Sequence, residues 1–127
     1  MKSELKDILS LIAATVFADK RILTSEIDVF ITSTLKLDIV KQLEPNISEA
    51  KLKAWFKRNK DDINQRLATP YYKDWLYEIL DRLKDVPNKE PILKVMEQIS
   101  IADQEVHVSE RTLIALSERY WRENGIL

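Results

Sequence analysis

The sequence of 127 residues contains no cysteine, one histidine and one glycine, Gly125. The absence of cysteine excludes disulfide bonds, thiolate metal sites and cysteine nucleophiles. Tight β-hairpins need glycine or asparagine at positive φ, so a chain with one glycine is not expected to be an all-β protein. The sequence also has no excess of one charge, because 20 Lys+Arg face 21 Asp+Glu. A net charge of −1 creates no field that would attract nucleic acid or anionic lipid.

Long hydrophobic runs are absent too. The apolar stretch within residues 1–20 is too short and too interrupted to span a bilayer, and no clear cleavage site follows it. We therefore expect a cytoplasmic protein that is not inserted in a membrane, which leaves peripheral membrane association open. The length predicts a single domain over residues 1–127, and nothing in the sequence fixes an oligomeric state.

Apolar residues recur in six segments at the i, i+3, i+4, i+7 spacing of amphipathic helices. The fold class predicted is therefore all-α, a single bundle of about six to seven helices with ordinary lengths. The segment Lys36–Glu44 is left open as a short seventh helix. The stripes run from Leu5 to Val16, Ile27 to Leu35, Leu52 to Leu67, Tyr72 to Leu83, Ile92 to Ile99, and Leu113 to Tyr120.

Polar residues between these stripes predict where helices begin and end. Ser48 is placed to cap the helix that follows it, and Thr69-Pro70 reads as a cap residue before a proline at the first helical position. Asn88 is predicted to open the next helix, and Asn124-Gly125 to end the last one.

An internal repeat links the two ends of the chain. Residues 8–31 align without gaps with residues 92–115, which lie 84 positions further along. A unit that cannot bury its apolar face alone packs against its copy, so we expect two helix-loop-helix units facing each other around a pseudo-two-fold axis. The identical pairs are Ile8/Ile92, Leu9/Leu93, Ala18/Ala102, Asp19/Asp103, Ser25/Ser109 and Glu26/Glu110.

Each unit carries an acidic motif in its loop. The first copy is Ala-Asp-Lys-Arg-Ile-Leu-Thr-Ser-Glu over residues 18–26, and the second is Ala-Asp-Gln-Glu-Val-His-Val-Ser-Glu over residues 102–110. The pair resembles the tellurite-resistance TerB-like family, which is all-helical and carries Ala-Asp-Gly-x-(Val/Ile)-x-x-x-Glu near both ends of its chain. Lys20 and Gln104 stand where the family has glycine, so the resemblance is to a divergent member.

The resemblance implies a small helical module linked to tellurite resistance or envelope stress. In related proteins a similar domain serves as an interaction module beside other domains. The acidic motif residues of the family are suspected of binding a divalent metal ion, which implies Asp19, Glu26, Asp103 and Glu110 as ligands here. His107 lies between the two acidic residues of the second motif and is a weak candidate for a further ligand or a pH-sensitive group, but a single histidine with no counterpart in the first motif is more often a loop surface residue.

The same four carboxylates also have a structural interpretation. Asp19 and Asp103 follow a helix, where an aspartate can accept N–H bonds from its own loop. Glu26 and Glu110 stand near the third position of the next helix, where a glutamate can reach back to the cap and where the helix dipole favours it. The alternative to a cation-binding module is therefore a structural or protein-binding domain whose acidic residues only cap and brace the loops.

Catalysis finds little support, because no Gly-rich phosphate loop and no recognisable Ser/His/Asp arrangement is present. Paired carboxylates keep a metal-dependent enzyme as a third hypothesis. No catalytic residue and no organic cofactor is assigned.

Aromatic residues indicate where a partner protein could bind. Trp55 and Phe56 are interleaved with basic residues, but they continue an apolar stripe, which favours core aromatics and a basic solvent face over nucleic-acid binding. Tyr71, Tyr72, Trp75 and Tyr77 read as core and rim of one helix, and they are residue types that favour protein interfaces. The partner expected is a protein and not a nucleic acid. The basic residues are Lys51, Lys53, Lys57, Arg58 and Lys60.

Overall fold

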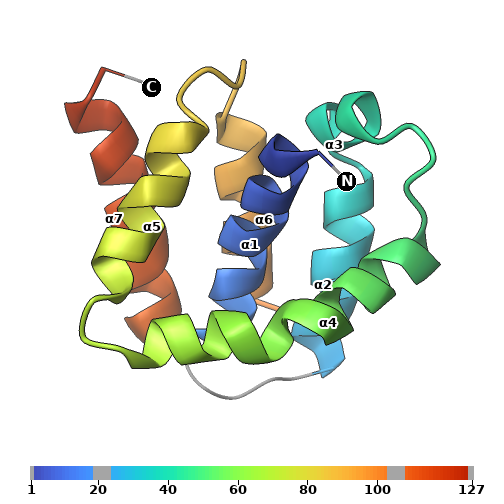
Figure 1. The fold of residues 1–127 in the computed structure, drawn as a ribbon, viewed down its shortest axis with the longest axis horizontal. Helices are drawn as coiled ribbons and strands as arrows, with labels where there is room; N and C mark the ends of the chain where they lie inside the picture. Colours follow the sequence, from blue (N-terminus) through green and yellow to red (C-terminus); the bar gives the residue numbers. More distant parts are fainter. Residues whose placement is uncertain (1, 19–23, 103–107, 126–127) are drawn as a thin grey trace.

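The computed structural model describes residues 2–18, 24–102 and 108–125, without the side chains of 108–110. Within these ranges the chain forms seven helices and no strand, so the prediction of an all-α bundle is confirmed (Figure 1). In chain order the helices are α1 (Ser3–Phe17), α2 (Thr24–Leu35), α3 (Asp38–Leu43), α4 (Glu49–Ala68), α5 (Tyr72–Arg82), α6 (Glu90–Ser100) and α7 (Val108–Glu123).

Helix α1 is the centre of the bundle and contacts each of the other six helices. The sequence predicts a one-sided apolar stripe, yet every residue from Leu11 to Phe17 is buried. A helix that is apolar all round belongs in a protein interior, and Figure 1 shows α1 between α4, α5 and α6. The core is therefore built around the first helix.

The helices of the two predicted repeat units pack against each other. α1 lies against α6, α2 also contacts α6, and α7 contacts α1. Within each unit the two helices are in contact as well. These contacts bring the units together as expected, while their pseudo-two-fold relation stays a prediction.

Two predicted helix boundaries are confirmed, and one open question is answered. Ser48 caps α4, because its Oγ accepts a hydrogen bond from the Lys51 N–H at 3.2 Å. The segment left open as a short helix contains α3. Gly125 follows the end of α7 at φ +69°, a left-handed conformation that glycine adopts without steric cost.

Two predicted helix starts are wrong. Thr69 does not cap α5: it ends α4, where its hydroxyl donates to the carbonyl of Arg66 at 3.0 Å, and α5 begins only at Tyr72. Asn88 adopts φ +54°, whereas an N-cap residue needs extended backbone. The residue that precedes α6 is Lys89. Both errors arise because these polar residues serve the turn before the helix.

A bidentate ion pair ties α5 to α1. The Arg82 Nε and Nη2 atoms each donate to a carboxylate oxygen of Asp7 at 3.0 Å. The Asp7 side chain is 15% exposed, so this pair is better shielded than the exposed pair of Asp62 and Arg66. We expect Arg82→Met to lower the free energy of unfolding by about 0.5–1 kcal/mol, and Arg66→Met by about 0.3 kcal/mol. Urea unfolding measures both, and equal losses would contradict this ranking.

Lys89 is a buried lysine, only 7% exposed, whose Nζ donates to the carbonyl of Val86 at 2.6 Å. Burial lowers the pKa of this ammonium below its ordinary value of 10.5, and Asp85 opposes the shift only in part. The folded state therefore holds this proton less tightly than the unfolded chain does. The resulting destabilisation is fully present below the folded pKa and disappears as the pH rises toward 10.5.

The wild-type protein is accordingly expected to gain stability relative to Lys89→Met as the pH rises through that range. Urea unfolding of both proteins at a series of pH values measures the difference. A difference that does not change with pH would contradict the lowered pKa.

Candidate functional site

The helix ends that flank the two acidic motifs lie at the same end of the bundle. α1 and α6 both end at the lower side of Figure 1, and α2 and α7 both begin there. The free N–H groups and positive dipole ends of α2 and α7 are therefore at this end, where they favour negative charge. The topology therefore places the start of each acidic motif at the same end of the bundle.

Only part of the predicted ligand set can be located. Asp19, Asp103 and His107 lie outside the described residues. Glu110 belongs to the first turn of α7, but its side chain is outside the description. Glu26 is the predicted ligand whose side chain the structure places, so the metal assignment as a whole stays a prediction.

Glu26 is completely buried in the first turn of α2. It lies four residues before the buried Phe30, so both side chains project from the face of α2 that packs on the core. A carboxylate removed from water costs several kcal/mol unless it is protonated, hydrogen-bonded, paired or ligated. Its place in the first turn of α2 is compatible with either of the two predicted roles.

A cluster of aromatic side chains packs α1 and α2 against α4 near this end of the bundle. Phe17, the last residue of α1, stacks on Phe56 of α4 with ring centroids 5.2 Å apart. Phe30 packs against the same Phe56 at 5.5 Å and against Trp55 at 6.4 Å. These contacts hold the end of α1 and the middle of α2 against α4.

The chemistry of the predicted set matches a hard divalent cation. Its four carboxylates offer oxygen donors, which Ca²⁺, Mg²⁺ and Mn²⁺ prefer. Among the residues that the structure describes, no group of three His, Cys, Asp or Glu side chains comes close enough to hold a metal ion. A cation at this end would therefore have to draw on the loop carboxylates, which lie outside the described residues.

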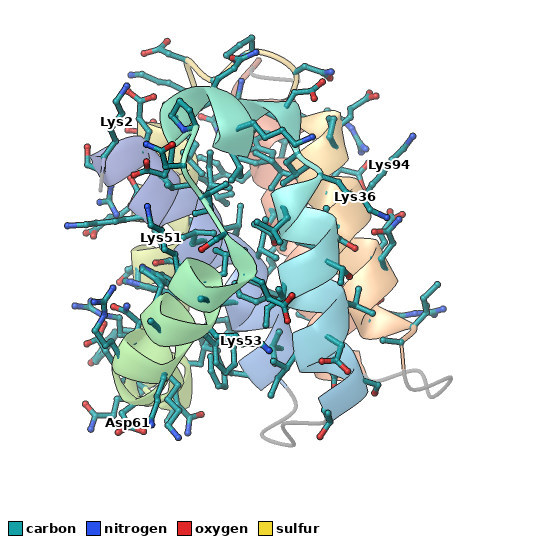
Figure 2. The ribbon with its side chains drawn as sticks, turned by 90° about the vertical axis from the view of Figure 1, so that its right-hand side faces the viewer. Lys2, Lys36, Lys51, Lys53, Asp61 and Lys94 are labelled. Atoms are coloured by element: carbon teal, nitrogen blue, oxygen red, sulfur yellow. The ribbon has the colours of Figure 1, made fainter. Side chains whose placement is uncertain are left out.

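The aromatic and basic residues of α4 lie as the sequence predicts, with the aromatic side chains in the core and the basic ones on the solvent face. Trp55 and Phe56 are 4% and 8% exposed and belong to the core, while the five basic side chains are exposed. Figure 2 shows Lys51 and Lys53 on α4 and Asp61 further along the same helix. Lys53 pairs with Glu49 at 2.8 Å, so part of this positive charge is neutralised within α4.

Sequence reasoning misses a second surface feature, a shallow and open hollow between α5 and α7. Tyr77 of α5 and Tyr120 of α7 stack there with ring centroids 4.8 Å apart. The sequence marks Tyr77 as a rim residue but gives no sign that α5 and α7 are neighbours. The spacing of the acids at positions 74, 78 and 81 is the signal that was available. The hollow is lined by Asp74, Tyr77, Glu78, Asp81 and Tyr120.

The chain matched no family model, no curated protein and no solved structure in comparisons with each. The TerB-like resemblance therefore depends on the two motifs alone. In the described part of the chain, no helix has both the length and the apolar character that crossing a membrane requires.

Proposed function

We propose that this chain is a TerB-like helical interaction module, associated with stress response or tellurite resistance, that binds a divalent cation through its two acidic motifs. Asp19, Glu26, Asp103 and Glu110 would hold the cation, with His107 as a weaker contributor. The cation would join the α1–α2 unit to the α6–α7 unit and so stiffen one end of the bundle. The observation that carries the proposal is the arrangement of α1, α2, α6 and α7, which brings the flanks of both acidic motifs to one end of the bundle, where Glu26 lies.

The alternative is that the acidic residues only brace the loops of a structural or protein-binding domain. One observation favours it: Glu26 is the third residue of α2, the position of the glutamate in a capping box. The two hypotheses differ in what a cation does to stability. A bracing carboxylate needs no ion, whereas a ligand carboxylate makes stability depend on ion concentration.

Thermal unfolding of the EDTA-treated protein with added Ca²⁺, Mg²⁺, Mn²⁺ or Zn²⁺ tests the proposal. At a hundredfold excess over Kd, an ion that binds only the folded state adds about 2.7 kcal/mol, which corresponds to a rise in Tm of roughly 10 °C. We expect one ion to produce such a rise, and we expect Asp19→Asn/Asp103→Asn to abolish it.

A matched control removes two carboxylates elsewhere. Asp74→Asn/Glu78→Gln lies on α5 and should keep the full response to the ion, which separates a defined site from a general effect of negative charge. No shift with any ion, combined with a large loss of stability in the metal-free Asp19→Asn/Asp103→Asn variant, would overturn the proposal in favour of bracing.

A further inference from the structure

The hollow between α5 and α7 combines aromatic faces with negative charge. Its aromatic wall is the stacked pair of Tyr77 and Tyr120, whose ring planes are inclined by 14°. The pair is held in place because the neighbouring Trp121 Nε1 donates to the carbonyl of Leu80 at 2.9 Å, which ties α7 to α5. The two stacked rings are therefore held in this arrangement before any ligand binds.

The negative charge comes from a row of acids on α5. Asp74, Glu78 and Asp81 are exposed and follow i, i+4, i+7 spacing, so they share one face of the helix. Like charges at i, i+4 destabilise a helix by a few tenths of a kcal/mol. Among the ion pairs of the described residues, none includes any of these three carboxylates.

The two arginines next to this row pair with other acids. Arg82 lies within electrostatic reach of Glu78, but its guanidinium donates twice to Asp7 of α1. Arg119 lies within reach of Tyr77, and its Nε donates to Glu123 at 2.9 Å. Arg82, and the exposed Lys73 and Lys84 beside the row, offset its charge only in part, and no ion pair of the described residues neutralises the three acids directly. The row is therefore complementary to a further cation from outside.

The spacing of the acids points to an extended chain. Asp74 and Glu78 are four residues apart, about 6 Å along the helix axis, and Glu78 and Asp81 are three apart, about 4.5 Å. Alternate residues of an extended peptide are about 6.6 Å apart, so long Lys or Arg side chains at every second position can reach successive acids. A compact metal ion fits less well, since no three carboxylates of the described residues converge on one point.

We propose that the α5–α7 hollow binds an extended Lys- or Arg-bearing segment of a partner protein. One cationic group lies against the Tyr77–Tyr120 pair, where the faces of aromatic rings attract cations. Its neighbours pair with Asp74, Glu78 and Asp81. This surface includes none of the proposed cation ligands, and its argument does not depend on them.

The test is fluorescence anisotropy of a peptide with alternating glycine and arginine, carrying four arginines and an uncharged dye, with EDTA present throughout. EDTA keeps the outcome separate from that of the metal proposal. Asp74→Asn/Glu78→Gln/Asp81→Asn should weaken binding at least about tenfold. The matched control, Asp28→Asn/Asp61→Asn/Asp62→Asn, removes the same charge from exposed positions on α2 and α4 and should change Kd by less than about twofold.

Two further comparisons make the assignment specific. A peptide with glutamine in place of arginine should not bind, and Tyr120→Leu, which keeps apolar volume and charge, should weaken binding severalfold. Circular dichroism checks that each variant is folded. Absence of binding to the wild-type protein, equal weakening in both triple variants, or full affinity in Tyr120→Leu would each overturn the proposal.

Discussion

Trp121→Ala is expected to lower the free energy of unfolding by about 4 kcal/mol, a large part of the total stability of a domain this size. Trp121 is fully buried in α7 and fills space between α7 and α5. Its Nε1 also donates to Leu80, whose carbonyl lies in the last turn of α5, where helix carbonyls lack an intrahelical partner. The substitution therefore opens a cavity and leaves a buried acceptor unsatisfied.

Trp121→Phe separates these two effects. It retains most of the apolar volume and removes the hydrogen bond, so we expect a loss of about 2 kcal/mol. Urea unfolding followed by far-UV circular dichroism measures both variants. A loss below about 1 kcal/mol for Trp121→Ala would show that α7 does not depend on this anchor.

Phe17→Ala is expected to cost about 3–4 kcal/mol and also to weaken any cation binding. Phe17 is 1% exposed, ends α1, and stacks on Phe56 of α4. Asp19 follows it by two residues, so the end of α1 sets the starting point of the first motif. Loss of the ring removes the contact that holds this starting point against the core.

Phe17→Leu is the conservative comparison, with an expected cost of about 1–1.5 kcal/mol and an unchanged cation response. Both variants are measured by urea unfolding with and without the ion that stabilises the wild-type protein. If Phe17→Ala lost stability but kept the full response to the ion, the packing of Phe17 in the aromatic cluster would not be needed for cation binding.

The fold could be predicted to the level of its helices because apolar spacing is a local property. The stripe from Tyr72 to Leu83 and the Ser48 cap depend on residues within one or two turns, and both appear in the structure. Thr69 and Asn88 were misassigned because a polar residue beside a helix can serve either the helix or the preceding turn. Backbone conformation decides between these roles, and sequence spacing does not show it.

The candidate sites were predictable to different degrees. The repeat placed Glu26 in an acidic motif, but its burial depends on packing between α2 and the rest of the core, which no local pattern reveals. The hollow between α5 and α7 joins Tyr77 to Tyr120 across a long stretch of sequence. The stacking of these residues follows from how the helices pack around α1.

Isothermal titration calorimetry of the metal-free chain tests the central claim most directly, since it reports how many ions bind and how tightly. The ion is the one that raises Tm, with Ca²⁺ and Mn²⁺ tried first. If the two motifs share one cation, one ion binds per chain, and Asp19→Asn and Asp103→Asn each weaken binding by at least about tenfold. Absence of binding, or unchanged affinity in either single variant, would contradict a cation site shared by the two acidic motifs.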